Sequence, residues 1–318
     1  MSAITRLSDG TSADEALRRH TSLRVGGPAR HFLASHDLSA LSRLLHAAVN
    51  DGARILVLGG GSNLLIADEG FNGVVLKYTA GEYTVDVLPG DELVVRAEAG
   101  ANLSSLARRL AREGLGGLEW AATVPGTVGG AVVNNAGAFG GCIADNLLDA
   151  EVVDAQEKLR LLAHRDMDYA YRTSTLKRGE AGPAIVRAAR LRVHRVDPKV
   201  ALARIHEQQA QRTASQPRQL SAGSIFANPP GDYSGRLIEA VGLKGARIGG
   251  AEISAQHANF IINSGSATAR DVYKLMRAAQ DAVWSEAGIW LHPEVQLVGG
   301  WTPDDLQALA APATAGPA

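Results

Sequence analysis

Residues 124–140 have the sequence VPGTVGGAVVNNAGAFG. Small residues are so dense here that a flat ring system could lie directly against the main chain. The other interpretation is a structural loop of several turns. A long irregular segment in a compact domain is usually functional, however, and this favours the ligand-binding interpretation. We therefore expect a glycine-punctuated loop over 118–141 that faces a ligand.

A second glycine cluster lies upstream. Residues 58–65 are LGGGSNLL, and they follow the predicted buried strand 55–58. Glycines after a strand let successive backbone N–H groups point at phosphate oxygens, and Ser62 and Asn63 add side-chain donors. The stretch lacks the Gly-Lys-Ser/Thr of a P-loop, and Leu64 stands where a Rossmann fingerprint has its third glycine. It predicts a phosphate-binding turn, with an ordinary strand–turn cluster as the alternative.

Three shorter motifs carry side chains that could do chemistry. Arg172, in YAYRTS, could place its fork on a carboxylate or phosphate, or could simply lie on the surface. Ser224, in AGSIFANP, is not in the Gly-x-Ser-x-Gly pattern of a hydrolase, and it could be an ordinary polar residue at a strand end. Glu294, in LHPEV, begins a predicted strand among apolar residues, where partial burial would disfavour the charged carboxylate. The alternative for Glu294 is a surface position on an edge strand.

Length and composition bound the class of protein. The chain has 318 residues, 46% of them hydrophobic, which is enough for two or three domains of roughly 100–200 residues each. The net charge is −1, and no basic block suggests nucleic acid or a membrane surface as a partner. Cys142 is the single cysteine, so we expect a reducing compartment and an inert side chain at that position.

Two further signals concern the location of the protein. The first residues lack the basic and then apolar pattern of a signal peptide. No apolar run reaches the roughly 18 residues that a membrane helix needs. We therefore expect a soluble, cytoplasmic protein.

The order of the predicted elements divides the chain. Residues 30–78 give strand, helix, strand, glycine loop and strand, which describes a small α/β unit. Residues 81–193 predict an α+β unit with a mixed sheet, and Asp197-Pro198 marks the boundary to a third unit. The predicted helices are 37–50, 102–113, 199–214, 233–241 and 268–287. The predicted strands are 30–34, 55–58, 74–77, 83–87, 93–97, 148–153, 184–193, 223–227, 257–263 and 293–298.

Seven motifs follow one another between about residue 20 and residue 299. They are HTSLRVGGPA, GGGSNLL, VPGTVGGAVVNNAGAFG, YRTS, AGSIFANP, GGAEISAQHANF and LHPEV. The series closely resembles the UDP-N-acetylenolpyruvoylglucosamine reductases and covers nearly the whole chain. The short spacing between Arg172 and Ser224 is similar to that of the family form without the loop insertion that carries a substrate-binding tyrosine.

The resemblance implies an α+β chain. Two subdomains would form an FAD-binding fold of the vanillyl-alcohol oxidase/PCMH type, and a C-terminal α/β domain would bind the substrate. Applied to this sequence, the resemblance predicts an N-terminal extension at 1–19, FAD-binding subdomains at 20–78 and 79–197, the substrate-binding domain at 198–303 and a disordered tail at 304–318.

The resemblance also implies an activity. It is the NADPH-dependent reduction of the enolpyruvyl ether of UDP-N-acetylglucosamine enolpyruvate to UDP-N-acetylmuramate, through non-covalent FAD, in peptidoglycan precursor synthesis. NADPH is the expected hydride donor, and no metal is expected. Two alternatives stay open: an FAD-dependent oxidase on the same fold, and a flavin- or nucleotide-sugar-binding module without catalysis. The sequence does not determine the oligomeric state or the preference for NADPH over NADH.

The resemblance assigns roles to residues of the motifs. Arg172 and a protonated Glu294 would lie near the substrate carboxylate, and Ser224 would give a proton to the carbanion-like carbon. The FAD diphosphate is expected at Gly59, Gly60, Gly61, Ser62 and Asn63. The flavin and ribityl chain are expected along Pro125, Gly126, Thr127, Gly129, Gly130, Ala136 and Gly137. The expected substrate-binding residues are Asn228, near the diphosphate, and Gln256, with His257 as a further candidate or a turn residue.

The sequence departs from the family pattern in three places. His20, Ala227 and His292 stand where members often have asparagine, lysine and an acidic residue. The difference at Ala227 removes a cation that could meet the substrate diphosphate. The candidates for a replacement are Arg212, Arg236, Lys244 and Arg247, and the sequence does not choose among them.

Overall fold

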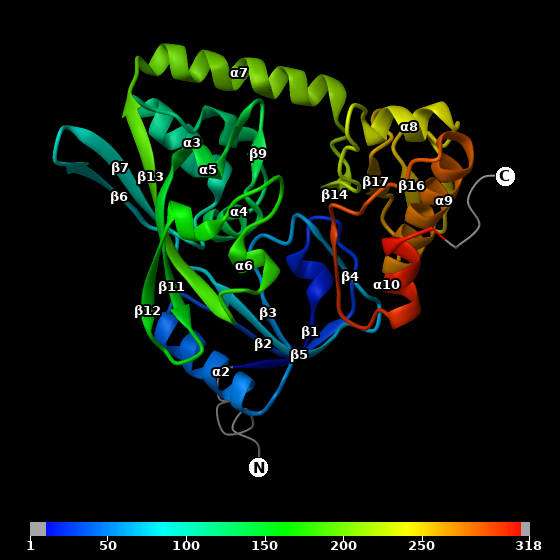
Figure 1. Ribbon diagram of the computed structural model, residues 1–318, viewed down its shortest axis with the longest axis horizontal. Helices are drawn as coiled ribbons and strands as arrows, with labels where there is room; N and C mark the ends of the chain where they lie inside the picture. The colour runs from blue at the N-terminus through cyan, green and yellow to red at the C-terminus, as the bar shows by residue number, and fades with distance from the viewer. Residues whose placement is uncertain (1–10, 313–318) are drawn as a thin grey trace. The chain divides into compact units, whose positions relative to one another are not determined.

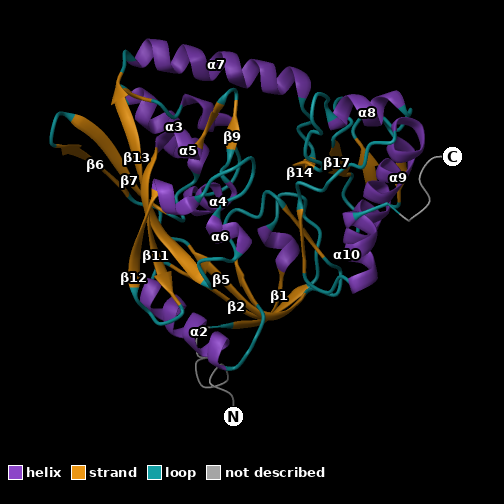
Figure 2. Cartoon of the chain, in the orientation of Figure 1, coloured by secondary structure: helices purple, strands orange, loops and turns teal. Residues whose placement is uncertain are grey.

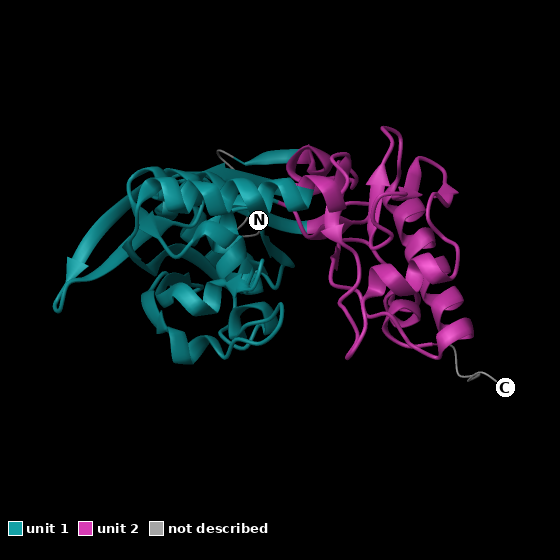
Figure 3. Ribbon diagram, turned by 90° about the horizontal axis from the view of Figure 1, so that it is seen from above, with its two compact units in different colours: residues 1–13, 31–60, 73–212 teal, residues 14–30, 61–72, 213–318 magenta. Residues whose placement is uncertain are grey.

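The computed structural model describes residues 11–312 (Figure 1), and the chain divides into two compact units (Figure 3). Unit 1 consists of residues 1–13, 31–60 and 73–212. Unit 2 consists of residues 14–30, 61–72 and 213–318. Each unit thus combines segments that are far apart in the sequence, and the division falls inside the GGGSN cluster.

A four-stranded sheet from the N-terminal part of the chain has the order β1-β2-β5-β3. Helix α2 (Leu38–Asn50) begins at Asp37, whose carboxylate accepts the Ser39 N–H at 2.8 Å. The predicted order of strand, helix and strand is therefore confirmed. The strands are β1 (Ser12–Ala16), β2 (Pro28–Ser35), β3 (Ile55–Val57) and β5 (Phe71–Tyr78), and the 3-10 helix η1 (Leu17–His20) follows β1.

Strand β13 (Ala184–Arg195) is central in the main sheet of unit 1 (Figure 2), whose order is β12-β11-β13-β7-β6 with β8 on the end of β13. Every pairing in it is antiparallel, so the predicted mixed sheet is wrong. The short connections 89–91 and 155–158 explain this, because tight links join only antiparallel neighbours. The other strands are β6 (Tyr83–Leu88), β7 (Glu92–Glu98), β8 (Leu115–Gly116), β11 (Leu147–Asp154) and β12 (Leu159–Ala163).

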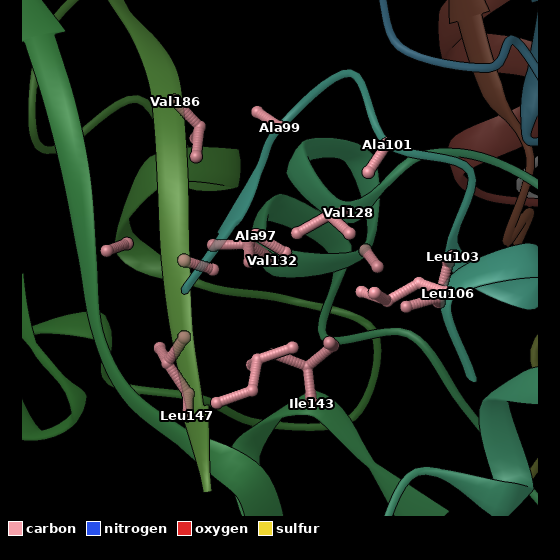
Figure 4. Packing of buried hydrophobic residues seen from close by; sticks show 14 of the residues in the cluster. Ala97, Ala99, Ala101, Leu103, Leu106, Val128, Val132, Ile143, Leu147 and Val186 are labelled. Atoms are coloured by element: carbon pink, nitrogen blue, oxygen red, sulfur yellow. The ribbon is translucent and has the colours of Figure 1, made fainter. Parts of the chain in front are cut away.

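Short helices pack on this sheet and close the core of unit 1 (Figure 4). Leu103, Val128 and Ile143 are fully buried in one cluster with Ala97 and Leu147 of the sheet. Full burial of such a side chain stabilises the fold by about 1.5–3 kcal/mol. Because Val128 lies inside the stretch 124–140, its burial anchors the glycine-rich segment to the sheet. The helices are α3 (Leu103–Arg112), α4 (Val128–Asn134) and α5 (Ile143–Asn146).

The predicted loop over 118–141 is partly wrong, because regular structure interrupts it. Helix α4 begins at Thr127, whose hydroxyl accepts the Gly130 N–H at 3.3 Å. Glycine costs a helix interior roughly 1 kcal/mol relative to alanine, and this made a loop the expectation. The glycine at 129 serves packing, however, since a Cβ there would lie 2.8 Å from the Cβ of Ala99. The segment also holds η2 (Glu119–Thr123) and the hairpin of β9 (Gly137–Ala138) and β10 (Gly141–Cys142).

The long helix α7 (Pro198–Ser215) follows β13 and runs along α3 (Figure 1). Ala201 and Ile205 are buried in the core of unit 1, and Arg108 of α3 donates to Gln209 at 2.8 Å. Two short elements, η3 (His164–Met167) and α6 (Thr175–Arg178), precede it. Within residues 11–312, no helix combines the length and apolar character that crossing a membrane requires.

Unit 2 is built on a second antiparallel sheet with the order β14-β17-β16-β15. A separate parallel pair joins β18 (Gln296–Val298) to β4 (Leu64–Ile66). Helix α9 (Ala269–Ala287) starts with a capping box of Thr268 and Asp271, and its apolar side enters the core. The remaining elements are β14 (Leu220–Ser224), α8 (Ser234–Ala240), β15 (Arg247–Ile248), β16 (Ala251–Ile253) and β17 (Phe260–Asn263).

Helix α10 (Pro303–Ala310) lies where the sequence predicts a disordered tail over 304–318, so that prediction is wrong for residues 304–310. The helix has a capping box of Thr302 and Asp305, and Leu309 is buried. Gln280 and Trp290 donate to the Leu309 carbonyl at 2.8 and 3.2 Å. The disorder prediction rests on the small residues and prolines of 311–318, whereas the contacts that hold residue 309 come from α9 and from Trp290. Residues 313–318 of the predicted tail lie outside the described residues.

The C-terminal helix makes stability depend on pH. Arg270 pairs with Asp305, and this pairing lowers the Asp305 pKa from 3.8 to about 2. A carboxyl with a depressed folded-state pKa contributes stability above the unfolded pKa of 3.8, and the contribution is lost as the pH falls toward about 2. Because solvent screens the partly exposed pair, we expect Asp305→Asn to cost only about 1 kcal/mol at neutral pH.

Urea unfolding at neutral pH and in acid measures this effect. We expect the stability gap between wild type and Asp305→Asn to close in acid. The neighbouring Asp304→Asn, exposed in the same helical turn, is the control and should stay close to wild type. A gap of the same size at every pH would contradict the assignment.

Candidate active site

The two glycine motifs predicted from the sequence meet in unit 1. A Cβ on Gly60 would lie 2.6 Å from the Cα of Gly126, and a Cβ on Gly59 would lie 2.8 Å from the Thr127 hydroxyl oxygen. Side chains at these positions would force the two turns apart. Glycine is therefore needed here for main chain to lie against main chain.

The turn before α4 is held firmly by the segment that follows β7. Gly126 accepts the Leu103 N–H at 3.1 Å, and the Val128 and Gly129 N–H groups donate to Ala101 and Ala99 at 2.9 Å each. These bonds fix the backbone from 126 to 129. Such a turn offers a preorganised surface to a ligand.

Gly130 differs from its neighbour Gly129. A Cβ on Gly130 would meet only the Thr127 hydroxyl oxygen, at 3.5 Å, so its other side is open. The backbone of Gly130 faces Gly59, whose Cβ would lie 3.6 Å from the Gly130 nitrogen. Bare main chain beside a threonine hydroxyl suits a flat ring with a polyhydroxyl chain, so these residues fit FAD.

The turn that follows α4 is clamped by the YAYRTS motif. Arg172 donates to the carbonyls of Gly137 and Asn135 at 2.9 and 3.4 Å. Tyr169 donates to Val132 at 2.9 Å, and Ser174 to Val133 at 2.6 Å. The predicted cofactor residues Ala136 and Gly137 thus lie in a turn whose carbonyls are satisfied by side chains.

Arg172 is itself fixed by contacts with its neighbours. Its φ is +56°, its carbonyl accepts the Lys177 ammonium at 2.7 Å, and its guanidinium lies 5.1 Å from the Tyr171 ring centroid. The side chain is half-buried. A guanidinium fixed in this way is suited to pairing with a carboxylate.

Ser224 and Glu294 come together in unit 2. Ser224 ends β14 opposite Phe260, after an irregularity at Gly223, whose φ is +77°. The next residue, Ile225, accepts the N–H groups of Glu294 and Val295 at 2.8 and 3.3 Å. Glu294 is therefore paired with the residue that follows Ser224, whereas the third predicted catalytic residue, Arg172, belongs to unit 1.

The end of the GGGSN cluster contacts the segment that carries Glu294. Asn63 donates from its amide to the Glu294 carbonyl at 3.2 Å, and its own carbonyl accepts the Gln296 N–H at 3.0 Å. Ser62 precedes it and is half-buried. Gly61 has a φ of +63° and lies against the His20 carbonyl, where a Cβ would collide. The cluster is divided between the two units. Unit 1 contains Gly59 and Gly60, and unit 2 contains Gly61, Ser62 and Asn63.

The two predicted substrate-binding residues both cap helices. The Asn228 side-chain oxygen accepts the Ser234 N–H at 3.1 Å at the start of α8, which leaves its amide hydrogens for a phosphate. Gln256 is exposed and donates to the carbonyls of Thr213 and Ala214 at 3.1 and 3.0 Å at the end of α7. Only the Gln256 oxygen is left for a ligand.

Asn259 holds the backbone next to Ser224, a structural role that the sequence analysis missed. It is 3% exposed, and its side chain accepts the Phe226 N–H at 2.9 Å and donates to the Phe226 carbonyl at 2.8 Å. Its carbonyl also accepts the Ile225 N–H at 2.9 Å. A single amide therefore fixes the backbone directly after Ser224. The signal in the sequence was an asparagine just before the apolar strand 260–262.

The four candidate cations for the lost lysine differ in their partners. Arg236 pairs with Asp232, Lys244 with Glu239 at 2.8 Å and Arg247 with Glu252 at 2.6 Å. Arg212 donates to the Thr123 carbonyl at 2.6 Å, and burial lowers its pKa. Among residues 11–312, Arg212 is the candidate of the four without a carboxylate partner.

Two other predicted features concern reactive groups. Burial raises the pKa of the Cys142 thiol, so its protonated, weakly nucleophilic form prevails at neutral pH. In the described part of the chain, no group of three or more His, Cys, Asp or Glu side chains is arranged to hold a metal ion.

Two family models match this chain, one in its N-terminal part and one in its C-terminal part. Residues 29–163 match the FAD binding domain, and residues 216–298 match the C-terminal domain of UDP-N-acetylenolpyruvoylglucosamine reductase. An FAD-binding domain followed by this reductase domain defines an FAD-dependent oxidoreductase, and the predicted α+β fold class is confirmed.

Relatives identify the family. The chain is 43% identical over 287 residues to the UDP-N-acetylenolpyruvoylglucosamine reductase of Chloroflexus aggregans, covering 90% of this chain and 96% of the relative. It is 44% identical over 294 residues to that of Synechococcus sp. strain RCC307, covering 90% and 93%. The crystal structure of the reductase (MurB) from Thermus caldophilus superposes with a TM-score of 0.75 at 37% identity, covering 89% and 97%. The chain belongs to the UDP-N-acetylenolpyruvoylglucosamine reductase family.

The contrast between Gly129 and Gly130 gives a matched pair of variants. Gly129→Ala should lower the melting temperature, because its Cβ would meet Ala99 at 2.8 Å in the core. Gly130→Ala should leave the melting temperature unchanged or raised, because alanine favours the helix and space is open. We expect Gly130→Ala to weaken FAD binding by about tenfold or more, since its Cβ would occupy the ligand side.

Thermal unfolding of the FAD-free variants and titration with FAD separate the two effects. If Gly130→Ala bound FAD as tightly as the wild type, FAD would not lie against Gly130. If Gly129→Ala were less stable than the wild type but bound FAD equally tightly, Gly129 would serve packing alone.

Proposed function

We propose that this chain reduces the enolpyruvyl ether of UDP-N-acetylglucosamine enolpyruvate to UDP-N-acetylmuramate with NADPH, as a step of peptidoglycan precursor synthesis. The observation that carries the proposal is the pairing of Ile225 with Glu294, which puts a hydroxyl and a carboxyl on adjacent backbone in unit 2. Family membership supports the substrate, because the relatives are named as reductases of this compound.

FAD would be held without a covalent bond by the glycine turns. The residues for this role are Gly59, Gly60, Gly61, Ser62, Asn63, Pro125, Gly126, Thr127, Gly129, Gly130, Ala136 and Gly137. When bound, it would pass electrons from NADPH to the substrate double bond. Close backbone contact between Gly60 and Gly126 supports this placement, since both predicted motifs share one surface.

The three catalytic side chains have separate tasks. Arg172 would pair with the substrate carboxylate, on which negative charge develops. Glu294 would donate a hydrogen bond to the same carboxylate, for which it must be protonated. Ser224 would give a proton to the neighbouring carbon. The fixed position of Arg172 supports its role, and the pairing of Glu294 with Ile225, the residue after Ser224, supports the other two.

The predicted ranges and location complete the proposal. Residues 20–78 and 79–197 would serve FAD binding, and 198–303 substrate binding, with Asn228 near the diphosphate and Gln256 in the same domain. We place the enzyme in the cytoplasm, because NADPH and the nucleotide-sugar substrate are made there and Cys142 is a free thiol.

An anaerobic titration distinguishes this function from its two rivals. NADPH alone should bleach the flavin absorbance, and the enolpyruvyl nucleotide should then restore it. An oxidase would show no bleaching by NADPH. A binding module without catalysis would be yellow and would respond to neither compound.

Ser224→Ala tests the proton donor. Loss of a general acid typically slows a reaction by about 10²–10⁴-fold, so flavin reoxidation by substrate should slow by that factor. Flavin reduction by NADPH should stay near the wild-type rate, because it needs no proton from Ser224. Rapid mixing under anaerobic conditions measures the two half-reactions separately.

Ser221→Ala is the matched control on the same strand, β14. It removes a hydroxyl of the same size and should leave both half-reactions unchanged. If Ser224→Ala slowed both half-reactions equally, the residue would not be the proton donor.

A further inference from the structure

Asn63 makes a contact that a role in diphosphate binding does not use. Its amide nitrogen donates to the Glu294 carbonyl at 3.2 Å, and its carbonyl accepts the Gln296 N–H at 3.0 Å. From Leu64 onward, the parallel pairing of β4 with β18 continues the connection. The last residue of the GGGSN cluster is thus tied directly to the segment that carries Glu294.

Both main-chain polar groups of Glu294 are occupied. Its N–H donates to Ile225 at 2.8 Å, and its carbonyl accepts from Asn63. With both groups held, the main chain at Glu294 is restrained, and with it the point and direction at which its side chain begins. Catalytic groups need placement within about 0.5 Å, which side-chain freedom alone does not supply.

The same line of contacts reaches Ser224. Ile225 follows Ser224 and is held from the other side by the Asn259 carbonyl at 2.9 Å. Asn63 therefore holds the main chain of Glu294, and Asn259 holds the main chain of the residue after Ser224. Asn259 is buried at 3% exposure, whereas Asn63 is half-buried at the end of a predicted phosphate-binding turn.

We propose that Asn63 is a positioning residue that couples binding of the cofactor diphosphate to the placement of the Glu294 carboxyl. An amide nitrogen carries two hydrogens, so one can hold the Glu294 carbonyl while the other meets a phosphate oxygen. A bound phosphate then fixes the Asn63 side chain and steadies Glu294. This inference rests on the proposed function, in which Glu294 acts on the substrate.

A double-mutant cycle in the FAD-loaded enzyme tests the coupling. Asn63→Ala is made in the wild type and in Glu294→Gln, with FAD saturating and its affinity measured separately by titration. We expect Asn63→Ala to slow flavin reoxidation by about tenfold or more in the wild type, because small misplacements of a catalytic group are costly. In Glu294→Gln, the same change should slow it by less than about twofold, since the shared route is already broken.

Two further readouts separate positioning from a general loss of structure. With FAD saturating, flavin reduction by NADPH should stay within about twofold of wild type in Asn63→Ala, because the proposed role of Glu294 is in the substrate step alone. The control Asn72→Ala removes an exposed asparagine that bonds Arg30 at 3.3 Å, and it should leave both half-reactions unchanged.

The outcomes that overturn the inference differ from those that overturn the function. If Asn63→Ala slowed reoxidation by the same factor in both backgrounds, or slowed both half-reactions equally, Asn63 would not act through Glu294. If Glu294→Gln alone left reoxidation at the wild-type rate, the catalytic role of Glu294 would fail, and the inference with it.

Discussion

The carbonyl oxygen of Ile225 accepts N–H groups from both Glu294 and Val295, at 2.8 and 3.3 Å. This one oxygen joins the end of β14 to the segment around Glu294, which lies about 70 residues later in the chain. Ser224 directly precedes Ile225. Just before this connection, β14 breaks its register between Ser221 and Ser224. The irregular backbone leaves the ladder at the position where the chemistry is proposed.

In unit 1, segments that are distant in sequence are brought together by glycines, which have no side chain. Gly59, Gly60 and Gly126 bring two turns into main-chain contact, and Gly129 brings α4 onto Ala99. The conformational entropy that glycine loses on folding is a cost of roughly 0.5–1 kcal/mol per residue. Burial of apolar residues of α3, α4 and α5 in the core of unit 1 offsets it. A rigid surface of bare backbone is thus supported by an ordinary apolar core.

Much of the fold could be predicted from local pattern, and the failures have local causes. The capped helix α2 and the long helix α9 follow from spacing and caps alone. Strand β12 was missed because its Leu159 and Leu161 are exposed, so no alternation toward a core marks it. Helix α4 was missed because glycines selected by close packing look like loop glycines. In the candidate site, motif order predicts Ser224 and Glu294, but only the tertiary structure shows that Asn63 and Asn259 hold the main chain of Glu294 and of the residue after Ser224.

Asparagine side chains hold irregular backbone at three places near the candidate site. Asn135 has a φ of +45°, accepts the Ala144 N–H at 3.0 Å and donates to the Ala170 carbonyl at 3.0 Å. Asn259 and Asn63 make the same kind of bond beside Ser224 and Glu294. The short amide offers a donor and an acceptor in the geometry of a peptide group, so it can replace a missing strand partner. Because an amide does not titrate in the pH range of proteins, its hydrogen bonds to the backbone do not depend on pH. Neutral amides thus hold the backbone beside Ser224 and Glu294, whereas after α4 the charged Arg172 shares this task by donating to the carbonyls of Asn135 and Gly137.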